Sequence, residues 1–231
     1  PSLNYNAVAQ GYSCDLVAAY LYGIGVKDMM VDIGEIYCDG VNPSGQSWTL
    51  GIDRPVDGNN ELGADIQGIF RVPAGPHGVV TSGNYRKFYV KGGRKYAHTI
   101  NPQTGYPVEH YLLSATIVAP DAMLADAYAT YCMVIGLEAA QQFIESHPEL
   151  EGCLIYDEDG VFRRNFADPG GPEAGGQHIA HQQSLLVGDG IGDLVQSLIR
   201  IGHPDILGLP AVDAAAQCPT TIFIGTVIHV T

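Results

Sequence analysis

Two short segments of this 231-residue chain carry residue types that could act together chemically. The first runs from His98 to Pro107 and reads HTINPQTGYP. Its dipeptides Asn101-Pro102 and Thr104-Gly105 favour turns, so the segment is predicted to be a loop that begins with an imidazole. An unperturbed imidazole titrates near pH ~6.5, which makes His98 a candidate general base at neutral pH. The alternative is a loop histidine that is structural or faces solvent.

The second segment runs from Leu124 to Thr130, reads LADAYAT and is predicted to be helical. Asp126 and Thr130 are four residues apart, so their side chains lie on one helix face. A carboxylate beside a hydroxyl is hard-oxygen ligation, which suits Mg²⁺ or Ca²⁺ rather than Zn²⁺. The alternatives are a solvated Asp126 and a Thr130 hydroxyl bonded to its own helix. Together with the loop histidine, this pair indicates metal-assisted phosphoryl chemistry.

The elements that must position these residues follow from the hydrophobic patterns. Helix-like and strand-like signals alternate over residues 1–160, which predicts an α+β fold with a mixed or antiparallel sheet and packed helices. Asp121, after Pro120, is the predicted N-cap of the helix that carries Asp126. The other predicted elements are the helices Asp15–Tyr22 and Leu137–Ser146, the strands Met29–Tyr37, Gln46–Ile52, Leu112–Ala119 and Cys153–Tyr156, a loop over Asp53–Gly68, and a hairpin of Asn84–Val90 with Arg94–Ile100.

The composition excludes several classes of function. The chain has 25 acidic and 11 basic residues, a net charge of −14 and 46% hydrophobic residues. We therefore expect a globular core without the basic footprint that a nucleic acid or an anionic membrane surface requires. No apolar run approaches the ~18 residues of a membrane span. The five cysteines include no CxxC pair, so they indicate neither a zinc site nor a disulfide framework.

The two ends of the chain are assigned no chemistry. The sequence begins at Pro1 and is patterned almost at once, so we expect a truncated start. The absence of a targeting segment then says nothing about the compartment. Residues 161–231 are expected to form a separate tail, with a linker over Ala167–Gly176, a short helix over Ile191–Ile201 and a strand over Thr220–Val230.

Six segments in one order resemble the FAD:protein FMN transferases, the ApbE-like flavin transferases. The resemblance covers roughly residues 1–160 and excludes the tail, and the N-terminal half of the family has no counterpart in this chain. The segments are Asn6–Asp15 (NAVAQGYSCD), Asp32–Ile36 (DIGEI), Trp48–Pro55 (WTLGIDRP), Val79–Tyr85 (VVTSGNY), His98–Pro107 (HTINPQTGYP) and Ser114–Thr130 (SATIVAPDAMLADAYAT).

The resemblance implies an activity and a set of site residues. Such enzymes use Mg²⁺ to cleave the pyrophosphate of FAD, attach FMN to a Ser or Thr hydroxyl of a target protein and release AMP. The family's metal ligands fall on Ala7, through its carbonyl, and on Asp126 and Thr130. The family's catalytic histidine falls on His98. The flavin-contacting positions fall on Asn4, Gln10, Thr81, Ser82, Gly83 and Ile100.

The chain departs from the family pattern at four positions. Asn101 stands where the family has Asp, Gln10 where Lys is common, and Asn4 where Asp is frequent, while Gly34 is single where the family has a glycine pair. These departures and the missing half leave two alternatives to flavin transfer, a metal-dependent FAD pyrophosphatase and a non-catalytic flavin-binding remnant. The resemblance also implies an acceptor protein as partner and a location in the cell envelope.

Overall fold

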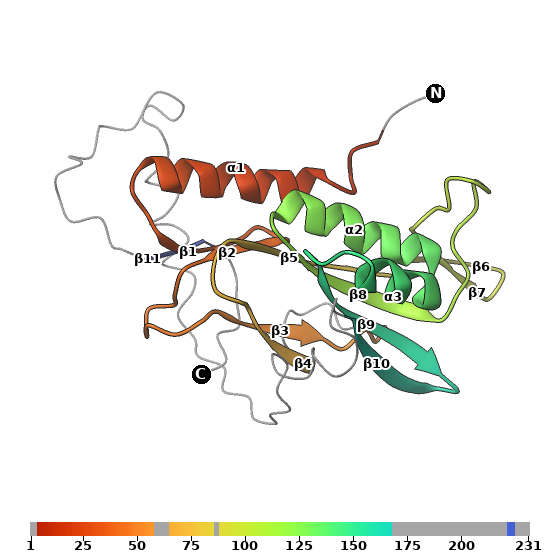
Figure 1. The fold of residues 1–231 in the computed structure, drawn as a ribbon. Helices are drawn as coiled ribbons and strands as arrows, with labels where there is room; N and C mark the ends of the chain where they lie inside the picture. Colours follow the sequence, from red (N-terminus) through yellow and green to blue (C-terminus); the bar gives the residue numbers. More distant parts are fainter. Residues whose placement is uncertain (1–3, 58–64, 86–87, 168–220, 225–231) are drawn as a thin grey trace.

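The computed structural model describes residues 4–57, 65–85, 88–167 and 221–224 (Figure 1). The described helices are α1 (Ala9–Gly23), α2 (Ala122–Ile135) and α3 (Leu137–Glu145). The described strands are β1 (Asp28–Asp32), β2 (Ile36–Asp39), β3 (Thr49–Asp53), β4 (Ile66–Arg71), β5 (His77–Gly83), β6 (Phe88–Lys91), β7 (Arg94–Ala97), β8 (Leu112–Ala119), β9 (Glu151–Glu158), β10 (Val161–Ala167) and β11 (Thr221–Ile224).

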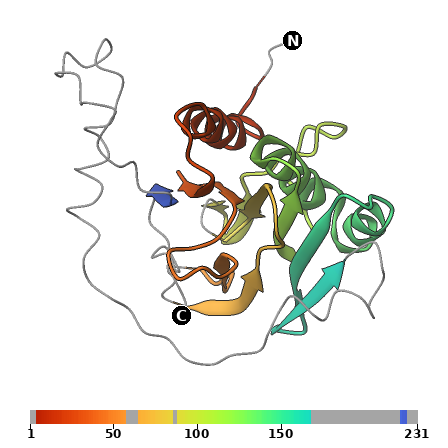
Figure 2. The ribbon, with the colours of Figure 1, turned by 60° about the vertical axis from the view of Figure 1, so that its left-hand side comes forward.

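Seven of these strands form one sheet in the order β10-β9-β8-β5-β2-β1-β11. Neighbouring strands are antiparallel except β1 and β11, which run parallel. The sheet is therefore mixed, and with its helices it confirms the predicted α+β class. The helices cover one face of the sheet and the β3–β4 hairpin covers the opposite face (Figures 1 and 2). The hairpin of β6 and β7 is a separate two-stranded sheet.

Strand β8 lies inside the sheet, between β9 and β5, and is buried on both faces. Ile117 and Ala119 pack with α2 and α3, whereas Val118 packs on the other side with Trp48 and Leu50 of the β3 region. This alternation follows from the two-residue period of a strand, and its continuous apolar sequence is what a strand covered on both sides needs. Each fully buried Leu or Ile side chain contributes about 1.5–3 kcal/mol to folding.

Local signals predicted several elements correctly. Strand Leu112–Ala119 has the predicted bounds, and the β6–β7 hairpin turns at the predicted Lys91-Gly92-Gly93 segment. Asp121 is the N-cap of α2: its backbone is extended, and its Oδ1 accepts a hydrogen bond from the Leu124 N–H at 2.8 Å. An Asp at this position satisfies one of the N–H groups that every helix start leaves unpaired.

The prediction of one strand over Met29–Tyr37 is wrong. The segment turns back on itself, and β1 and β2 pair antiparallel with Asp32 opposite Ile36. Gly34 makes this turn with φ +111°, a conformation that disfavours other residues, and its N–H donates to Asp32 Oδ1 at 3.0 Å. The predicted loop Asp53–Gly68 is also too long at its end, because β4 begins at Ile66.

The sheet continues beyond residue 160. Strand β10 pairs along its whole length with β9, and β11 adds a short edge beside β1. Most of the linker predicted over Ala167–Gly176 and the helix predicted over Ile191–Ile201 lie outside the described residues, as does the predicted strand Thr220–Val230 apart from β11. None of the described helices combines the length and apolarity that crossing a membrane takes.

Candidate functional site

Asp126 projects from α2 and is bound by the start of α1. The side chain is 4% exposed, and its Oδ2 accepts a hydrogen bond from the Gly11 N–H at 3.1 Å. Gly11 lies in the first turn of α1, where backbone N–H groups have no partner within the helix. A Cβ at Gly11 would overlap the carbonyl of Ala122, so the two helix backbones meet closely because this residue has no side chain.

The Ala7 carbonyl lies just before α1 and is left outside the helix. An uninterrupted helix would bond this carbonyl to the N–H of Gly11, four residues later. Val8, the N-cap, has φ −146°, and the helical bonding begins with the Tyr12 N–H donating to the Val8 carbonyl at 2.9 Å. Since the Gly11 N–H goes to Asp126, the Ala7 carbonyl accepts no hydrogen bond from any described residue.

Oxygens of these types suit a small divalent cation. Within the described part of the chain, Gly11 is the donor that reaches the Asp126 carboxylate, so Oδ1 remains available as a ligand. Thr130 follows one helical turn later on the same face. No three His, Cys, Asp or Glu side chains gather into a metal site among the described residues. A cation here would therefore depend on one carboxylate with neutral oxygens, water or substrate phosphate, which is the ligation typical of Mg²⁺.

The electrostatics of Asp126 agree with this fit. Burial raises the pKa of the Asp126 carboxyl, and the hydrogen bond from Gly11 partly lowers it. The charged form is thus disfavoured in the protein alone, because a buried carboxylate loses its water without a full set of partners. A cation beside Oδ1 would supply the missing compensation.

Strand β5 separates the two hydroxyl groups of the predicted Thr81-Ser82-Gly83 segment. Ser82 Oγ lies 3.2 Å from Thr130 Oγ1, so Ser82 faces α2. Thr81 Oγ1 lies 2.8 Å from Thr116 Oγ1 of β8, on the face that carries the β3–β4 hairpin. Successive side chains of a strand point to opposite faces, so only Ser82 belongs to the side of the sheet that holds Asp126.

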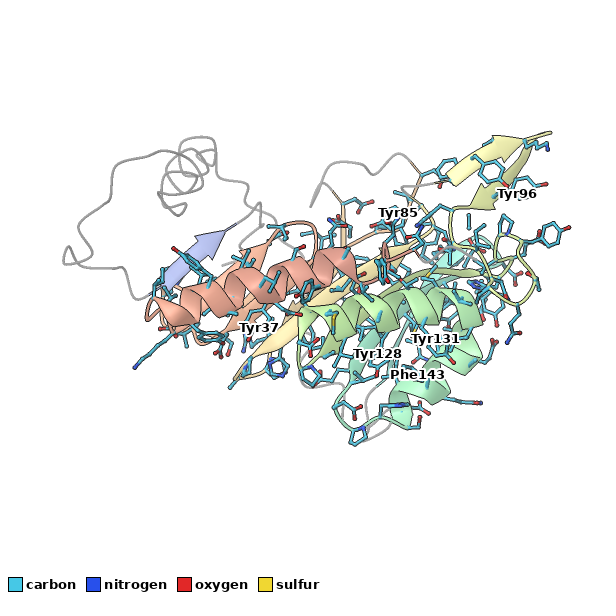
Figure 3. The ribbon with its side chains drawn as sticks, turned by 90° about the horizontal axis from the view of Figure 1, so that it is seen from above. Tyr37, Tyr85, Tyr96, Tyr128, Tyr131 and Phe143 are labelled. Atoms are coloured by element: carbon cyan, nitrogen blue, oxygen red, sulfur yellow. The ribbon has the colours of Figure 1, made fainter. Side chains whose placement is uncertain are left out.

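Gly83 ends β5 and has a packing role. A Cβ there would lie 2.7 Å from the ring of Tyr85 and 3.2 Å from the Leu113 carbonyl. The missing side chain lets the Tyr85 ring, 6% exposed, cover the end of the strand (Figure 3).

His98 is exposed and directly follows β7, at the head of the predicted loop. The neighbouring Thr99 Oγ1 donates to Asn84 Oδ1 at 3.2 Å, just after the end of β5. Ser82 near that strand end contacts Thr130. These contacts hold the loop at the end of the sheet where Ser82 contacts Thr130.

Asn101 organises the His98–Pro107 loop. Its Oδ1 accepts hydrogen bonds from the N–H groups of Gln103 and Thr104 at 2.8 and 3.3 Å, an Asx turn that an Asp would form equally well. Ile100 is paired with Pro107 in an antiparallel bridge and is 47% exposed. The departure at Asn101 thus preserves the turn and removes one negative charge beside His98.

The two remaining predicted flavin contacts lie around the start of α1. Asn4 is exposed, and its Oδ1 accepts a hydrogen bond from the Asn6 N–H at 2.8 Å. Gln10 Nε2 donates to the Ile33 carbonyl at 3.2 Å, so its amide holds the β1–β2 turn. A Cβ at Gly34 would meet this amide, which is the end of a flexible side chain and can move, so the positive φ of Gly34 is what favours glycine in the turn.

Asp15 of α1 holds the helix that carries Asp126, a role that the sequence did not predict. Its two carboxylate oxygens accept hydrogen bonds from the N–H groups of Ala122 and Met123, each at 2.9 Å. Asp15 of α1 thereby caps α2, while Asp126 of α2 caps α1. The four-residue spacing of Gly11 and Asp15 placed both on one face of α1, but their partners lie more than 100 residues away in sequence.

Comparison with known proteins gives consistent matches. Residues 2–154 match the ApbE family. The FAD:protein FMN transferase of Salmonella typhimurium is 37% identical over 157 residues, which are 67% of this chain and 41% of that protein. The FAD:protein FMN transferase of Escherichia coli K12 is 36% identical over 157 residues, with the same shares of 67% and 41%.

A solved structure is similar over the same part of the fold. The apo form of the flavinyl transferase ApbE of Pseudomonas stutzeri is 30% identical, with a TM-score of 0.59, and the match covers 72% of this chain and 49% of that one. The chain spans about two fifths of the length of the two curated relatives and half of the solved structure.

Proposed function

Because this chain belongs to the ApbE family, we propose that the protein transfers FMN from FAD to a Ser or Thr hydroxyl of a partner protein, with Mg²⁺ as the metal and AMP as the second product. The observation that carries the proposal is that the Asp126 carboxylate has a hydrogen-bond donor on only one of its two oxygens among the described residues. Within this described part of the chain, the Gly11 N–H binds one carboxylate oxygen, the other oxygen is available, and the Ala7 carbonyl just before α1 accepts no hydrogen bond. The names of the similar proteins support the flavin transfer.

The reaction balances without an oxidant or a covalent enzyme intermediate. The acceptor hydroxyl oxygen forms a bond to the phosphorus of the FMN phosphate. The bond from this phosphorus to the bridging oxygen breaks, and that oxygen leaves with AMP. The hydroxyl proton passes to a base, for which we propose Nδ1 or Nε2 of His98. Such a reaction depends mainly on alignment and on neutralising phosphate charge.

The proposed metal ligands are the Ala7 carbonyl, the Asp126 carboxylate and the Thr130 hydroxyl. When bound, Mg²⁺ supplies positive charge to the pyrophosphate oxygens. Asp126 would hold the ion by charge, whereas Ala7 and Thr130 would fix its position as neutral ligands. Ser82 would orient the Thr130 hydroxyl through their 3.2 Å contact.

The proposed flavin contacts have different degrees of support from the fold. Ser82 and Gly83 lie at the end of β5 that faces the candidate site, and Ile100 is exposed in the adjoining loop. Asn4 and Gln10 lie at the start of α1 near Ala7. Thr81 has its hydroxyl bonded to Thr116 on the opposite sheet face, so we propose that it contributes through its backbone. We further propose that the protein acts in the cell envelope.

The test is incubation of the protein with FAD, Mg²⁺ and a candidate acceptor protein, followed by mass spectrometry and nucleotide chromatography. Covalent FMN on the acceptor with an equal amount of AMP is the expected result, and chelation of Mg²⁺ should abolish it. An acceptor in which the modified Thr is replaced by Val is the matched control. Free FMN with AMP would replace the proposal with FAD hydrolysis. Tight FAD binding without cleavage would identify a flavin binder.

A further inference from the structure

The basic residues of this acidic chain are concentrated in one part of the sequence. Residues 66–108 contain six of the 11 Lys and Arg residues and no Asp or Glu, so this stretch has a net charge of +6. The rest of the chain has five basic and 25 acidic residues, a net charge of −20. Five of the six basic residues, Arg86, Lys87, Lys91, Arg94 and Lys95, fall within ten residues of one another in the sequence.

Strands β6 and β7 form their hairpin within this basic stretch, and it exposes apolar side chains. Along β6, Phe88, Tyr89 and Val90 are 37%, 50% and 62% exposed. The rings of Tyr89 and Tyr96 stack across the two strands with centroids 5.1 Å apart and planes 10° from parallel. The hairpin extends from the end of the main sheet (Figures 1 and 3).

The hairpin leads directly into the loop of the proposed reaction. Strand β7 ends at Ala97, and His98 is the next residue. In the same loop Tyr106 is 74% exposed and Ile100 is 47% exposed. In the sequence, exposed apolar side chains therefore lie on both sides of His98, the residue proposed to take the acceptor's proton.

We propose that the β6–β7 hairpin docks an acidic, aromatic-rich segment of the acceptor polypeptide and so brings its hydroxyl to the site; this rests on the proposed function. Charges of like sign on the rest of the surface repel an acidic partner, so the hairpin is where such a segment is steered. The Tyr89 ring, 50% exposed and stacked on the half-buried Tyr96, supplies apolar contact area for aromatic side chains of the segment. A polypeptide is favoured because the proposed reaction already requires a protein hydroxyl beside His98.

The first experiment measures binding of a fluorescein-labelled peptide in which Glu and Phe alternate around one Thr. The variant is Lys91→Glu, because Lys91 is exposed at the hairpin turn. The matched control is Lys27→Glu, which changes the charge equally at an exposed residue between α1 and β1. At an ionic strength of about 0.15 M we expect Lys91→Glu to weaken binding about tenfold or more and Lys27→Glu by less than about twofold, since at this salt concentration only a nearby charge acts strongly. Tyr89→Ser should also weaken binding, and far-UV circular dichroism of all variants checks folding.

Three outcomes would overturn the inference. The first is equal weakening by Lys91→Glu and Lys27→Glu, which would indicate net charge alone. The second is loss of binding to phosphatidylserine-containing vesicles in Lys91→Glu with peptide binding intact, which would indicate a membrane contact. The third is an equal loss of FAD affinity, which would assign the basic residues to the flavin.

Failure of this inference is distinguishable from failure of the proposed function. Release of AMP from FAD, measured with a full-length acceptor protein at saturating concentration, reports on the metal site and the pyrophosphate. If Lys91→Glu binds the peptide as the wild type does and AMP release is normal, only the inference about the hairpin is contradicted. If peptide binding depends on Lys91 but the protein never cleaves FAD, the proposed function is contradicted. The hairpin would then be a docking surface that serves another function.

Discussion

The junction of α1 with α2 and the β6–β7 hairpin differ in burial, charge and the way they are held. At the junction, Asp126 is buried and Gly11 brings two helix backbones into contact. At the hairpin, Tyr89 and Val90 are half exposed or more, and the surrounding sequence is basic. The first region is fixed by backbone contacts that leave few alternative arrangements. The second is a small two-stranded sheet of its own.

This difference matches what the two halves of the proposed reaction need. A metal site works only if its ligands are held within a few tenths of an ångström, which rigid helices provide better than loops. The reciprocal capping of α1 by Asp126 and of α2 by Asp15 holds these ligands from both sides. Recognition of a polypeptide depends instead on exposed area and long-range charge, which a projecting hairpin provides.

The largest effect is expected from Asp126→Asn at the junction. Asn keeps an oxygen for the Gly11 N–H and removes the single charge among the proposed ligands, so Mg²⁺ should bind much more weakly. Release of AMP from FAD should fall by about 100- to 1,000-fold, the scale of losing one electrostatic stabiliser. Turnover measured against Mg²⁺ concentration checks this. Wild-type kinetics in the variant would show that Asp126 does not hold the metal.

Two further variants sharpen the same measurement. Thr130→Ala removes a neutral ligand and should be rescued in part by excess Mg²⁺. His98→Ala should not be rescued, because His98 is proposed to move a proton rather than bind the metal. Restoration of His98→Ala by Mg²⁺ would mean that these two roles are assigned wrongly.

Gly11→Ala is the next largest effect and acts on stability. The new Cβ would overlap the backbone carbonyl of Ala122, which no side-chain rotation relieves, so the free energy of unfolding should fall by about 1–3 kcal/mol. Gly23→Ala in the last turn of α1 is the control, because nothing lies within 4 Å of its Cβ position. Urea unfolding of both variants makes the comparison. Equal stability of the two would mean that the junction is looser than its geometry indicates.

The sequence predicted the parts of the fold that depend on local signals. The Asp121 cap, the strand Leu112–Ala119 and the glycine turn of the β6–β7 hairpin are all encoded within a few residues. The turn between β1 and β2 was missed because Ile33 and Ile36 continue the apolar pattern through it. Gly34 alone is a weak turn signal when strand residues lie on both sides.

The candidate site was only partly predictable for the same reason. Spacing alone paired Asp126 with Thr130, since both lie on one helix. The contacts of Asp126 with Gly11 and of Thr130 with Ser82 span 115 and 48 residues, and no local pattern reports such distances. That the Thr81 and Ser82 side chains lie on opposite faces of the sheet could be predicted only if β5 was first predicted as a strand, because successive residues of a strand alternate between the faces.

Asp15→Asn tests the second cap of the junction through pH. Burial raises the pKa of Asp15, with Asp121 adding to the rise and the hydrogen bonds from Ala122 and Met123 opposing it. The folded protein thus holds a proton more tightly than the unfolded chain. This contribution to stability is complete below the unfolded pKa and is lost as pH rises through the raised folded pKa. The unfolding free energy of the wild type, relative to Asp15→Asn, should therefore decline from about pH 3 upward. An increase over that range would contradict the assignment.

The smallest effects come from a pair of tyrosines that compares the two regions directly. Tyr131 on α2 is 45% exposed and Tyr89 on β6 is 50% exposed, so each presents a similar area to solvent. Each also has a ring partner among the described residues. The ring centroids of Tyr131 and Phe143 of α3 lie 5.0 Å apart (Figure 3), and those of Tyr89 and Tyr96 lie 5.1 Å apart. Replacement by Ala removes one aromatic pair in both cases.

The two replacements should nevertheless differ in their effect on global unfolding. Tyr131→Ala should lower the free energy of unfolding by about 1 kcal/mol, because the α2–α3 contact is part of the main core. Tyr89→Ala should lower it by less than about 0.3 kcal/mol, because a separate two-stranded sheet can open locally before the domain unfolds. Hydrogen exchange of residues 88–97 should speed up in Tyr89→Ala while exchange in β8 stays unchanged. Equal losses of global stability would show that the hairpin is as firmly integrated as the helices and does not open separately from the main sheet.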